Sequence, residues 1–267
     1  MVLSRLRDAL RKNTVKKRLA EARIFAEFGN GYEATMIYAE LKCGRNPDPE
    51  VFAEEAAYWA RRGRVEEAEL MLAAVLKRYP VTERLWVDYA ALAERRRDWN
   101  EACRRWDDVR IRFPATLRAY TGLGEAFRRL GKLTEADAML GAARELASKD
   151  QVIAVTHARL AAERKDWAEA VRRWTTIRER FPGNADGYAG GALALRASRR
   201  FTEAEKLAAT GVKLFPASAP VLIQFARCAV DRRDWESAVP RWERVLGVDP
   251  DNKMALEGIS QARKVSI

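Results

Sequence analysis

The stretch Asp166–Pro182, DWAEAVRRWTTIRERFP, recurs along the chain and decides its fold. Two close copies, DWNEACRRWDDVRIRFP at Asp98–Pro114 and DWESAVPRWERVLGVDP at Asp234–Pro250, lie 68 residues from it on either side. Weaker copies begin halfway between, at Arg64, Lys132 and Arg200. The period is therefore 34 residues, and self-similarity at this spacing indicates an array of repeated units.

Each unit carries small residues where two helices would cross. Counted from position 1 to position 34, the units begin at Val15, Pro49, Glu83, Leu117, Gln151, Ala185 and Ala219. Position 20 is alanine in all seven units and position 8 is alanine or glycine, which lets two helices approach closely. Position 24 is large in six units, and proline at position 32 in five units ends the second helix. The pattern predicts an antiparallel pair of helices in each unit.

This pattern resembles the tetratricopeptide repeat family. The matching residues of the third unit are Trp86, Tyr89, Ala90, Ala102, Trp106 and Pro114. The resemblance covers roughly Val15 to Asn252 and implies an all-α fold, a right-handed superhelical α-solenoid of about seven 34-residue repeats. It also implies a concave face lined by the first helix of each pair. The half-a-TPR repeat of RNA-processing scaffolds is the alternative, but the regular spacing and the prolines favour the tetratricopeptide label.

Two terminal segments flank the array, which we place at residues 15–252. Residues 1–14 form a predicted basic amphipathic helix, and Val2, Leu3, Leu6 and Leu10 gather on its apolar side. Docking of Met1–Lys17 on an anionic membrane or in a partner groove is one interpretation, and an N-terminal cap is the other. Residues 253–267 form a predicted C-terminal capping helix, whose apolar face is expected to consist of Met254, Leu256, Ile259 and Ala262.

The overall composition favours acidic partners. Lys and Arg number 49 against 38 Asp and Glu, giving a net charge of +11, which suits an acidic peptide, nucleic acid or an anionic membrane. Cys43, Cys103 and Cys228 show no paired spacing, as expected in a reducing compartment. The sequence has no apolar run of membrane-spanning length and no signal-peptide pattern, so we expect a cytoplasmic protein.

Tryptophans and charges follow the longer 68-residue period. Trp106, Trp174 and Trp242 stand at position 24, and we interpret them as core wedges between hairpins; a stacking ladder for a ligand is the alternative. Arginine doublets in these units face acidic stretches in the units between them. We expect ion pairs between neighbouring units, each worth at most about 1 kcal/mol at the surface.

First-helix positions 2, 5, 9, 12 and 13 are those that the family turns towards the groove. The arginines at these positions are Arg84, Arg118, Arg128, Arg129, Arg159, Arg196 and Arg227. Acidic exceptions are Glu94, Glu125 and Asp186. Guanidinium groups in a row can hold carboxylates in bidentate fashion, so these arginines are the predicted partner-binding residues.

The sequence shows no catalytic constellation. His157 has no nucleophile placed near it by the periodicity, and Gly29–Gly31 lacks the spacing of a phosphate-binding loop. We therefore expect a non-enzymatic scaffold, without cofactor or metal, that binds an acidic segment of another protein in the arginine-lined groove. A nucleic-acid-binding repeat and a membrane-peripheral adaptor are the alternatives, and an exposed terminal hairpin leaves self-association open.

Overall fold

The structure is a computed structural model that describes residues 2–44 and 46–265, and side chains for 14–44 and 46–264. The described residues form fifteen α-helices and no strand. They divide into an N-terminal unit, Met1–Lys132, and a C-terminal unit, Leu133–Ile267. The predicted all-α fold of paired helices is confirmed.

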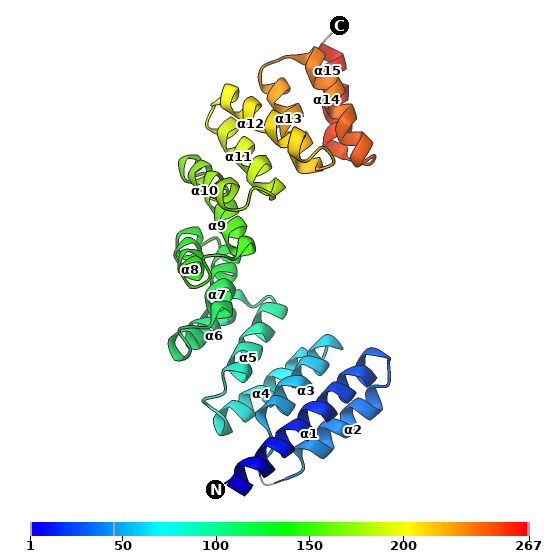
Figure 1. Ribbon diagram of the computed structural model, residues 1–267, viewed down its shortest axis with the longest axis vertical. Coiled ribbons are helices and arrows are strands. Elements are labelled where there is room, and N and C mark those ends of the chain that lie inside the picture. The colour runs from blue at the N-terminus through cyan, green and yellow to red at the C-terminus, as the bar shows by residue number, and fades with distance from the viewer. Residues whose placement is uncertain (1, 45, 266–267) are drawn as a thin grey trace. The chain divides into compact units, whose positions relative to one another are not determined.

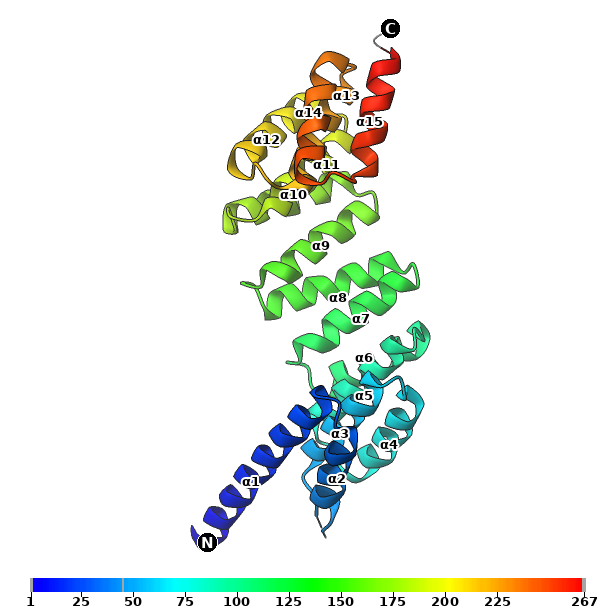
Figure 2. The same cartoon turned by 90° about the vertical axis from the view of Figure 1, so that its right-hand side faces the viewer.

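Consecutive helices run antiparallel and pack as hairpins within each unit (Figure 1) (Figure 2). The N-terminal unit contains α1 (Val2–Glu27), α2 (Gly31–Lys42), α3 (Pro49–Arg61), α4 (Val65–Arg78), α5 (Glu83–Arg95), α6 (Trp99–Arg112) and α7 (Leu117–Arg129). The C-terminal unit contains α8 (Leu133–Leu146), α9 (Gln151–Glu163), α10 (Trp167–Arg180), α11 (Ala185–Ala197), α12 (Phe201–Leu214), α13 (Ala219–Asp231), α14 (Trp235–Val248) and α15 (Lys253–Val265).

The helix boundaries follow the repeat. From α3 onward, each first helix begins at the predicted first residue of its unit. The aspartates that open the recurring stretch, Asp98, Asp166 and Asp234, are N-caps of α6, α10 and α14. Each carboxylate accepts a hydrogen bond from the backbone N–H three residues later, at 3.1 Å, and so satisfies one of the free donors at the helix start.

The turn inside each hairpin requires a left-handed backbone at position 15. Glycine meets this requirement at Gly29, Gly63 and Gly131, with φ of 86°, 84° and 74°. Arg97, Lys165, Arg199 and Arg233 occupy the same position with φ between 57° and 61°. A Cβ atom is strained in this conformation, so these four positions hold a residue that the turn disfavours.

We expect Lys165→Gly to raise the free energy of unfolding by about 0.5–1 kcal/mol, because relief of the left-handed strain exceeds the extra entropy of glycine in the unfolded chain. Urea-induced unfolding followed by circular dichroism measures the change. Gly131→Lys is the reciprocal control and should destabilise by a similar amount. Unchanged stability in both variants would contradict the strain argument.

The predicted small-residue contacts form the core of each hairpin. Every alanine at position 20 is fully buried, from Ala34 to Ala238. Trp106, Trp174 and Trp242 at position 24 are 0%, 3% and 2% exposed, so the core interpretation of these residues is confirmed.

Each of these tryptophans packs on a glycine that the sequence analysis missed. The glycines are Gly122, Gly190 and Gly258, each sixteen residues later at position 6 of the following helix. A Cβ atom added at any of them would lie 2.3–2.5 Å from the nearest atom of the indole ring of its tryptophan and would clash with it. In the units between, where position 24 is not tryptophan, position 6 carries a side chain.

The expected ion pairs between neighbouring repeats are present, but they are largely buried and do not lie at the surface. The arginines at position 23 are Arg105, Arg173 and Arg241, with side chains 4%, 11% and 17% exposed. Each pairs with an acidic residue 36 positions earlier, Glu69, Asp137 or Glu205. Each also donates to a backbone carbonyl at position 7 of its own unit, at 2.8–3.0 Å. The limit of about 1 kcal/mol describes solvent-exposed pairs and so does not apply to these pairs, in which loss of one partner would leave an uncompensated charge.

The terminal segments differ from the expected boundaries. One continuous helix, α1, spans the predicted division between residues 1–14 and the first repeat. The side chains of Val2, Leu3, Leu6 and Leu10 lie outside the described residues.

At the other end, α15 confirms a C-terminal helix packed on α14, but its predicted face was partly wrong. Met254 and Leu256 are 39% and 51% exposed, whereas Ala255, Ile259 and Ala262 are buried. Residues 255, 259 and 262 share one side of a helix, and residues 254 and 256 flank it.

Candidate functional site

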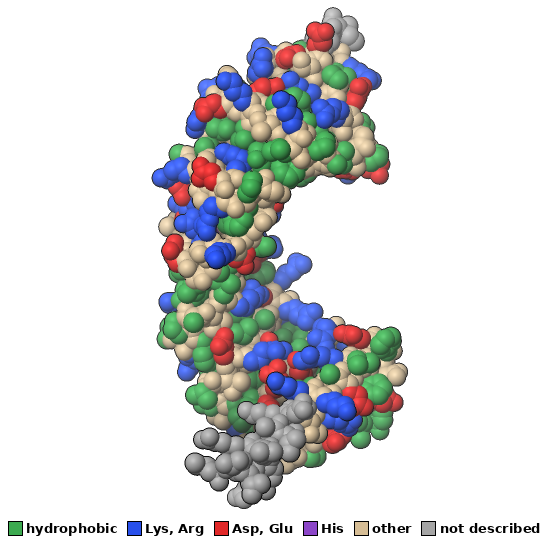
Figure 3. Space-filling model, in the orientation of Figure 1, with side chains coloured by type: hydrophobic (Ala, Val, Ile, Leu, Met, Phe, Trp, Pro, Cys, Tyr) green, Lys and Arg blue, Asp and Glu red, His purple; other side chains and the backbone are tan. Residues whose placement is uncertain are grey.

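The predicted arginines fall into two sets, one in each unit. In the N-terminal unit, the arginines of α5 and α7 are already engaged by acidic side chains. Arg84 contacts Glu50, Glu54 and Asp88 at 2.9–3.3 Å. Positive and negative side chains accordingly lie intermixed on the visible face of this unit (Figure 3).

Two of the three acidic exceptions noted in the sequence, Glu94 and Glu125, are the partners of the α7 arginines. Arg118 pairs with Glu94 at 2.6 Å, and Glu125 accepts from both Arg128 and Arg129 at 2.8 and 2.7 Å. The guanidinium of Arg118 also lies over the ring of Trp106, 4.9 Å from its centroid. These arginines therefore hold carboxylates of their own chain.

In the C-terminal unit, three predicted arginines lie on α9, α11 and α13. Arg159 is 61% exposed and contacts Asp186 at 3.0 Å, while Arg196 pairs with Asp231 at 2.6 Å. Arg227 is half-buried and has no ion pair within the described side chains. Burial, and then the positive charge of Arg196, lower the pKa of Arg227. The carboxylate of Asp231 opposes this shift in the pKa.

A hollow of about 470 Å³ lies on these same helices. Its apolar lining comprises Trp167, Trp174, Ala162, Ala189, Gly190, Leu193 and Pro220. Its polar rim comprises Arg159, Glu163, Asp186 and Gln224. Most of these residues stand at positions 2, 5, 9, 12 and 13 of their repeats, the predicted groove positions. We call this hollow the α9–α13 pocket.

Sequence reasoning missed the apolar part of the pocket. It singled out charged residues at the groove positions, although Ala162, Ala189, Leu193 and Pro220 occupy those positions too. The signal in the sequence was a change at the groove positions, from charged residues in the third repeat to small or apolar residues in the fifth and sixth repeats. An apolar pocket with a few polar groups on its rim is a typical ligand site.

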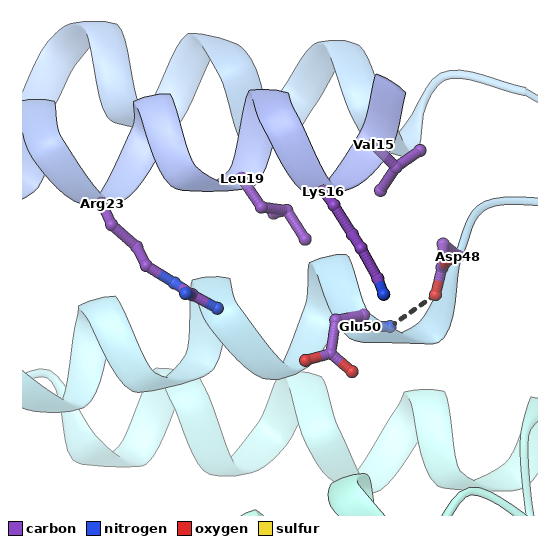
Figure 4. Close-up of a pocket in the computed structure, with 6 residues that line it drawn as sticks. All are labelled: Val15, Lys16, Leu19, Arg23, Asp48 and Glu50. Carbon is purple, nitrogen blue, oxygen red and sulfur yellow. Dashed lines mark hydrogen bonds between the residues drawn. The ribbon is translucent and has the colours of Figure 1, made fainter. Parts of the chain in front are cut away.

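A second hollow, of about 600 Å³, lies between α1 and α3 (Figure 4). Val15, Lys16, Leu19 and Arg23 line it from α1, and Asp48 and Glu50 face them across it. The two cations and two carboxylates balance, and Glu50 already contacts Arg84 at 3.1 Å. None of the predicted partner-binding arginines is among the residues that line this hollow.

His157 is buried in the ion-pair cluster of Arg173, as a structural histidine should be. Its Nε2 lies 3.2 Å from a carboxylate oxygen of Asp137. Burial, and then the charge of Arg173, lower the pKa of His157 to about 4, although Asp137 opposes the shift. Tyr89 and Phe225 stand at the equivalent position of the other two clusters, where arginine stacks on their rings at 3.7 Å.

We expect His157 to make the protein sensitive to acid. Between pH 6.5 and about 4 the unfolded histidine binds a proton that the folded one does not, so the free energy of unfolding decreases as the pH falls through this window. The decrease amounts to roughly 3 kcal/mol. His157→Phe should remove it, as measured by chemical denaturation at a series of pH values. Phe225→His is the reciprocal control and should add a similar decrease; identical pH profiles for all three proteins would refute the assignment.

Two kinds of site have no support in the described part of the chain. No group of three or more His, Cys, Asp or Glu side chains there is arranged to hold a metal ion. No helix there combines the length and apolar character that a membrane crossing needs.

Comparison with known proteins identifies the repeat. A family model of the tetratricopeptide repeat matches residues 90–150 and 155–219. These two stretches of the chain are similar to the tetratricopeptide repeat. Tetratricopeptide repeats are commonly scaffolds for protein–protein interaction and are generally not enzymes.

Solved tetratricopeptide repeat proteins share the fold. The C-terminal part of one from Cytophaga hutchinsonii has a TM-score of 0.71 at 16% identity, covering 90% of this chain and 99% of that one. One from Parabacteroides merdae has a TM-score of 0.58 at 14% identity, covering 94% and 99%. YrrB, described as a TPR protein with an unusual peptide-binding site, has a TM-score of 0.55 at 14% identity, covering 70% and 96%. A search of curated proteins gave no match.

Proposed function

We propose that this tetratricopeptide repeat protein is a scaffold that binds an acidic segment of a partner protein in the α9–α13 pocket. The observation that carries the proposal is an apolar hollow with Arg159 in its lining, on the first helices of the C-terminal unit. Arg227 stands outside the lining, three residues after the lining residue Gln224 on α13. The apolar lining buries anchor side chains of the partner, and the two guanidinium groups bind its carboxylates. The peptide-binding site attributed to YrrB supports a peptide as the ligand.

The N-terminal arginines have a different role in this proposal. Arg84, Arg118, Arg128 and Arg129 are held by carboxylates of their own unit, so a ligand carboxylate would have to displace those contacts. Their main contribution to binding is long-range attraction within a chain of net charge +11, which accelerates encounter with an acidic partner.

The test is selection of binding peptides from a displayed random library. We expect the selected peptides to combine Asp or Glu with an apolar residue. Their affinity should fall more than about tenfold for the double variant Arg159→Glu/Arg227→Glu. Arg244→Glu/Arg232→Glu is the matched control, because both arginines are exposed in the same unit and stand outside the predicted groove positions of their repeat.

Three outcomes would reject the proposal. Selected peptides without acidic residues would remove the charge argument. An equal loss in both double variants would show non-specific attraction to a basic protein. Displacement of the peptides by a homopolymeric RNA at low concentration, with a steep dependence on salt, would favour nucleic acid as the ligand.

A further inference from the structure

The three tryptophans at position 24 make the same contact with glycine but differ in what meets the indole N–H. In the N-terminal unit, Trp106 Nε1 donates to Glu94 Oε1 at 2.8 Å. The other oxygen of Glu94 accepts from Arg118 at 2.6 Å. The carboxylate of Glu94 therefore lies beside this indole ring, between the indole N–H and the guanidinium of Arg118.

Glu94 stands at position 12 of its repeat, and the residue at that position changes in the two later tryptophan repeats. It is Ala162 beside Trp174 and Val230 beside Trp242. Trp174 Nε1 and Trp242 Nε1 are both buried without a hydrogen-bond partner among the described residues. An unsatisfied buried donor costs about 1–3 kcal/mol and is uncommon in native proteins, so each case calls for an explanation.

The two cases differ in the room left beside the ring. Val230 packs against the apolar cluster of Trp242, and Ala162 packs against that of Trp174. Ala162 is smaller, and both Ala162 and Trp174 line the α9–α13 pocket. Asp186 stands here at the repeat position of Arg118, so the guanidinium at this pocket comes from a different position, Arg159, which lies one helical turn before Ala162 on α9. Arg159 is 61% exposed and pairs with Asp186 at 3.0 Å, so a ligand carboxylate would bind it by sharing or displacing this contact.

We infer that the α9–α13 pocket receives a carboxylate side chain of the partner at the place that Glu94 fills in the N-terminal unit, with Trp174 Nε1 donating to one oxygen and Arg159 to the other. This inference rests on the proposed function and assigns its specificity-determining contact. Trp174 and Ala162 become partner-binding residues, Trp174 through its N–H and Ala162 through its small size. The acidic residue of the partner is the one inserted deepest.

The first experiment tests the geometry without any ligand. Ala162→Glu places a carboxylate of the chain itself where the partner's is inferred to bind. In ¹H–¹⁵N spectra the indole N–H signal of Trp174, assigned by its loss in Trp174→Phe, should move downfield, and the melting temperature should rise. Ala162→Val, which copies Val230, fills the space without an acceptor and should leave the indole proton in place. An unmoved indole signal in a folded Ala162→Glu protein would overturn the inference.

The second experiment uses a blocked pentapeptide with a central glutamate flanked by leucines, and its twin with glutamine at the centre. The glutamate peptide should shift the Trp174 indole signal of the unmodified protein and bind at least about tenfold more tightly than the glutamine peptide. Both Ala162→Glu and Ala162→Val should abolish the difference. Equal binding of the two peptides, or no shift at millimolar concentration, would overturn the inference.

Failure of this contact and failure of the proposed function give different results. If library-selected acidic peptides lose affinity in Arg159→Glu/Arg227→Glu but not in Ala162→Glu, the scaffold function stands and the Trp174 contact is wrong. If the library yields no acidic peptides, the proposed function is wrong, while the indole shift of Ala162→Glu still reports on the geometry.

Discussion

Replacing Arg241 with alanine is expected to lower the free energy of unfolding by about 3 kcal/mol. Arg241 pairs with Glu205 at 2.7 Å, donates to the carbonyl of Phe225 at 3.0 Å and stacks on the Phe225 ring. Among the described side chains Glu205 has no other cationic partner, so the substitution leaves a largely buried carboxylate uncompensated. Thermal and urea unfolding of the C-terminal unit's helices report the loss.

Two further variants separate this explanation from a general effect of removing arginine. Arg244→Ala, on the same helix but exposed, should change stability by less than about 0.5 kcal/mol. Replacing both partners, as Arg241→Met/Glu205→Leu, should recover most of the stability, because an apolar pair needs no compensation. A loss below about 1 kcal/mol for Arg241→Ala would show that the pair behaves like a surface ion pair.

Trp106→Ala is expected to cost about 3–5 kcal/mol, since it removes a fully buried ring from the contact between α6 and α7. Gly122→Ala should cost about 1–3 kcal/mol for the opposite reason, because the added methyl overlaps the Trp106 ring. In the double variant the methyl enters space that the ring has vacated. The two losses should therefore sum to more than the loss of the double variant, by at least about 1 kcal/mol in a double-mutant cycle.

Gly247→Ala is the control for this cycle. Gly247 lies in α14 and a Cβ atom there meets no other atom within 4 Å, so alanine should be neutral or stabilising by up to about 1 kcal/mol. Additive losses at positions 106 and 122 would show that the two residues do not share the interface as described.

Local periodicity was enough to predict the fold but not the chemistry of its interfaces. The 34-residue period located the helices because alanine, tryptophan and proline recur at fixed positions. The pairing of Arg105 with Glu69 spans 36 residues and depends on which side of each helix meets the neighbouring one. The sequence indicated opposite charges in adjacent units, yet their burial follows from packing that no single unit contains. The tryptophan–glycine contact was missed for the same reason.

The candidate site was predicted only as a set of positions. Arg159 and Arg227 stand where the family resemblance placed groove residues, and the structure leaves them accessible or unpaired. Glu94 and Glu125 appeared in the sequence as exceptions to an arginine row, whereas they are the counter-charges of Arg118, Arg128 and Arg129. Whether an arginine is free depends on neighbours one turn or one helix away, and a list of groove positions omits that information.

The interfaces between successive repeats alternate between two kinds, and this determines by how many residues the chain can be shortened or lengthened. Excising one repeat, residues 117–150, would bring Trp106 against Thr156 and leave Arg173 facing Cys103 instead of Asp137. Excising two repeats, residues 117–184, would restore a glycine, Gly190, beneath Trp106 and preserve the pairing of Arg241 with Glu205. Length variants of this protein that fold should therefore differ by 68 residues. Both natural duplication and protein engineering would have to add or remove two repeats at a time.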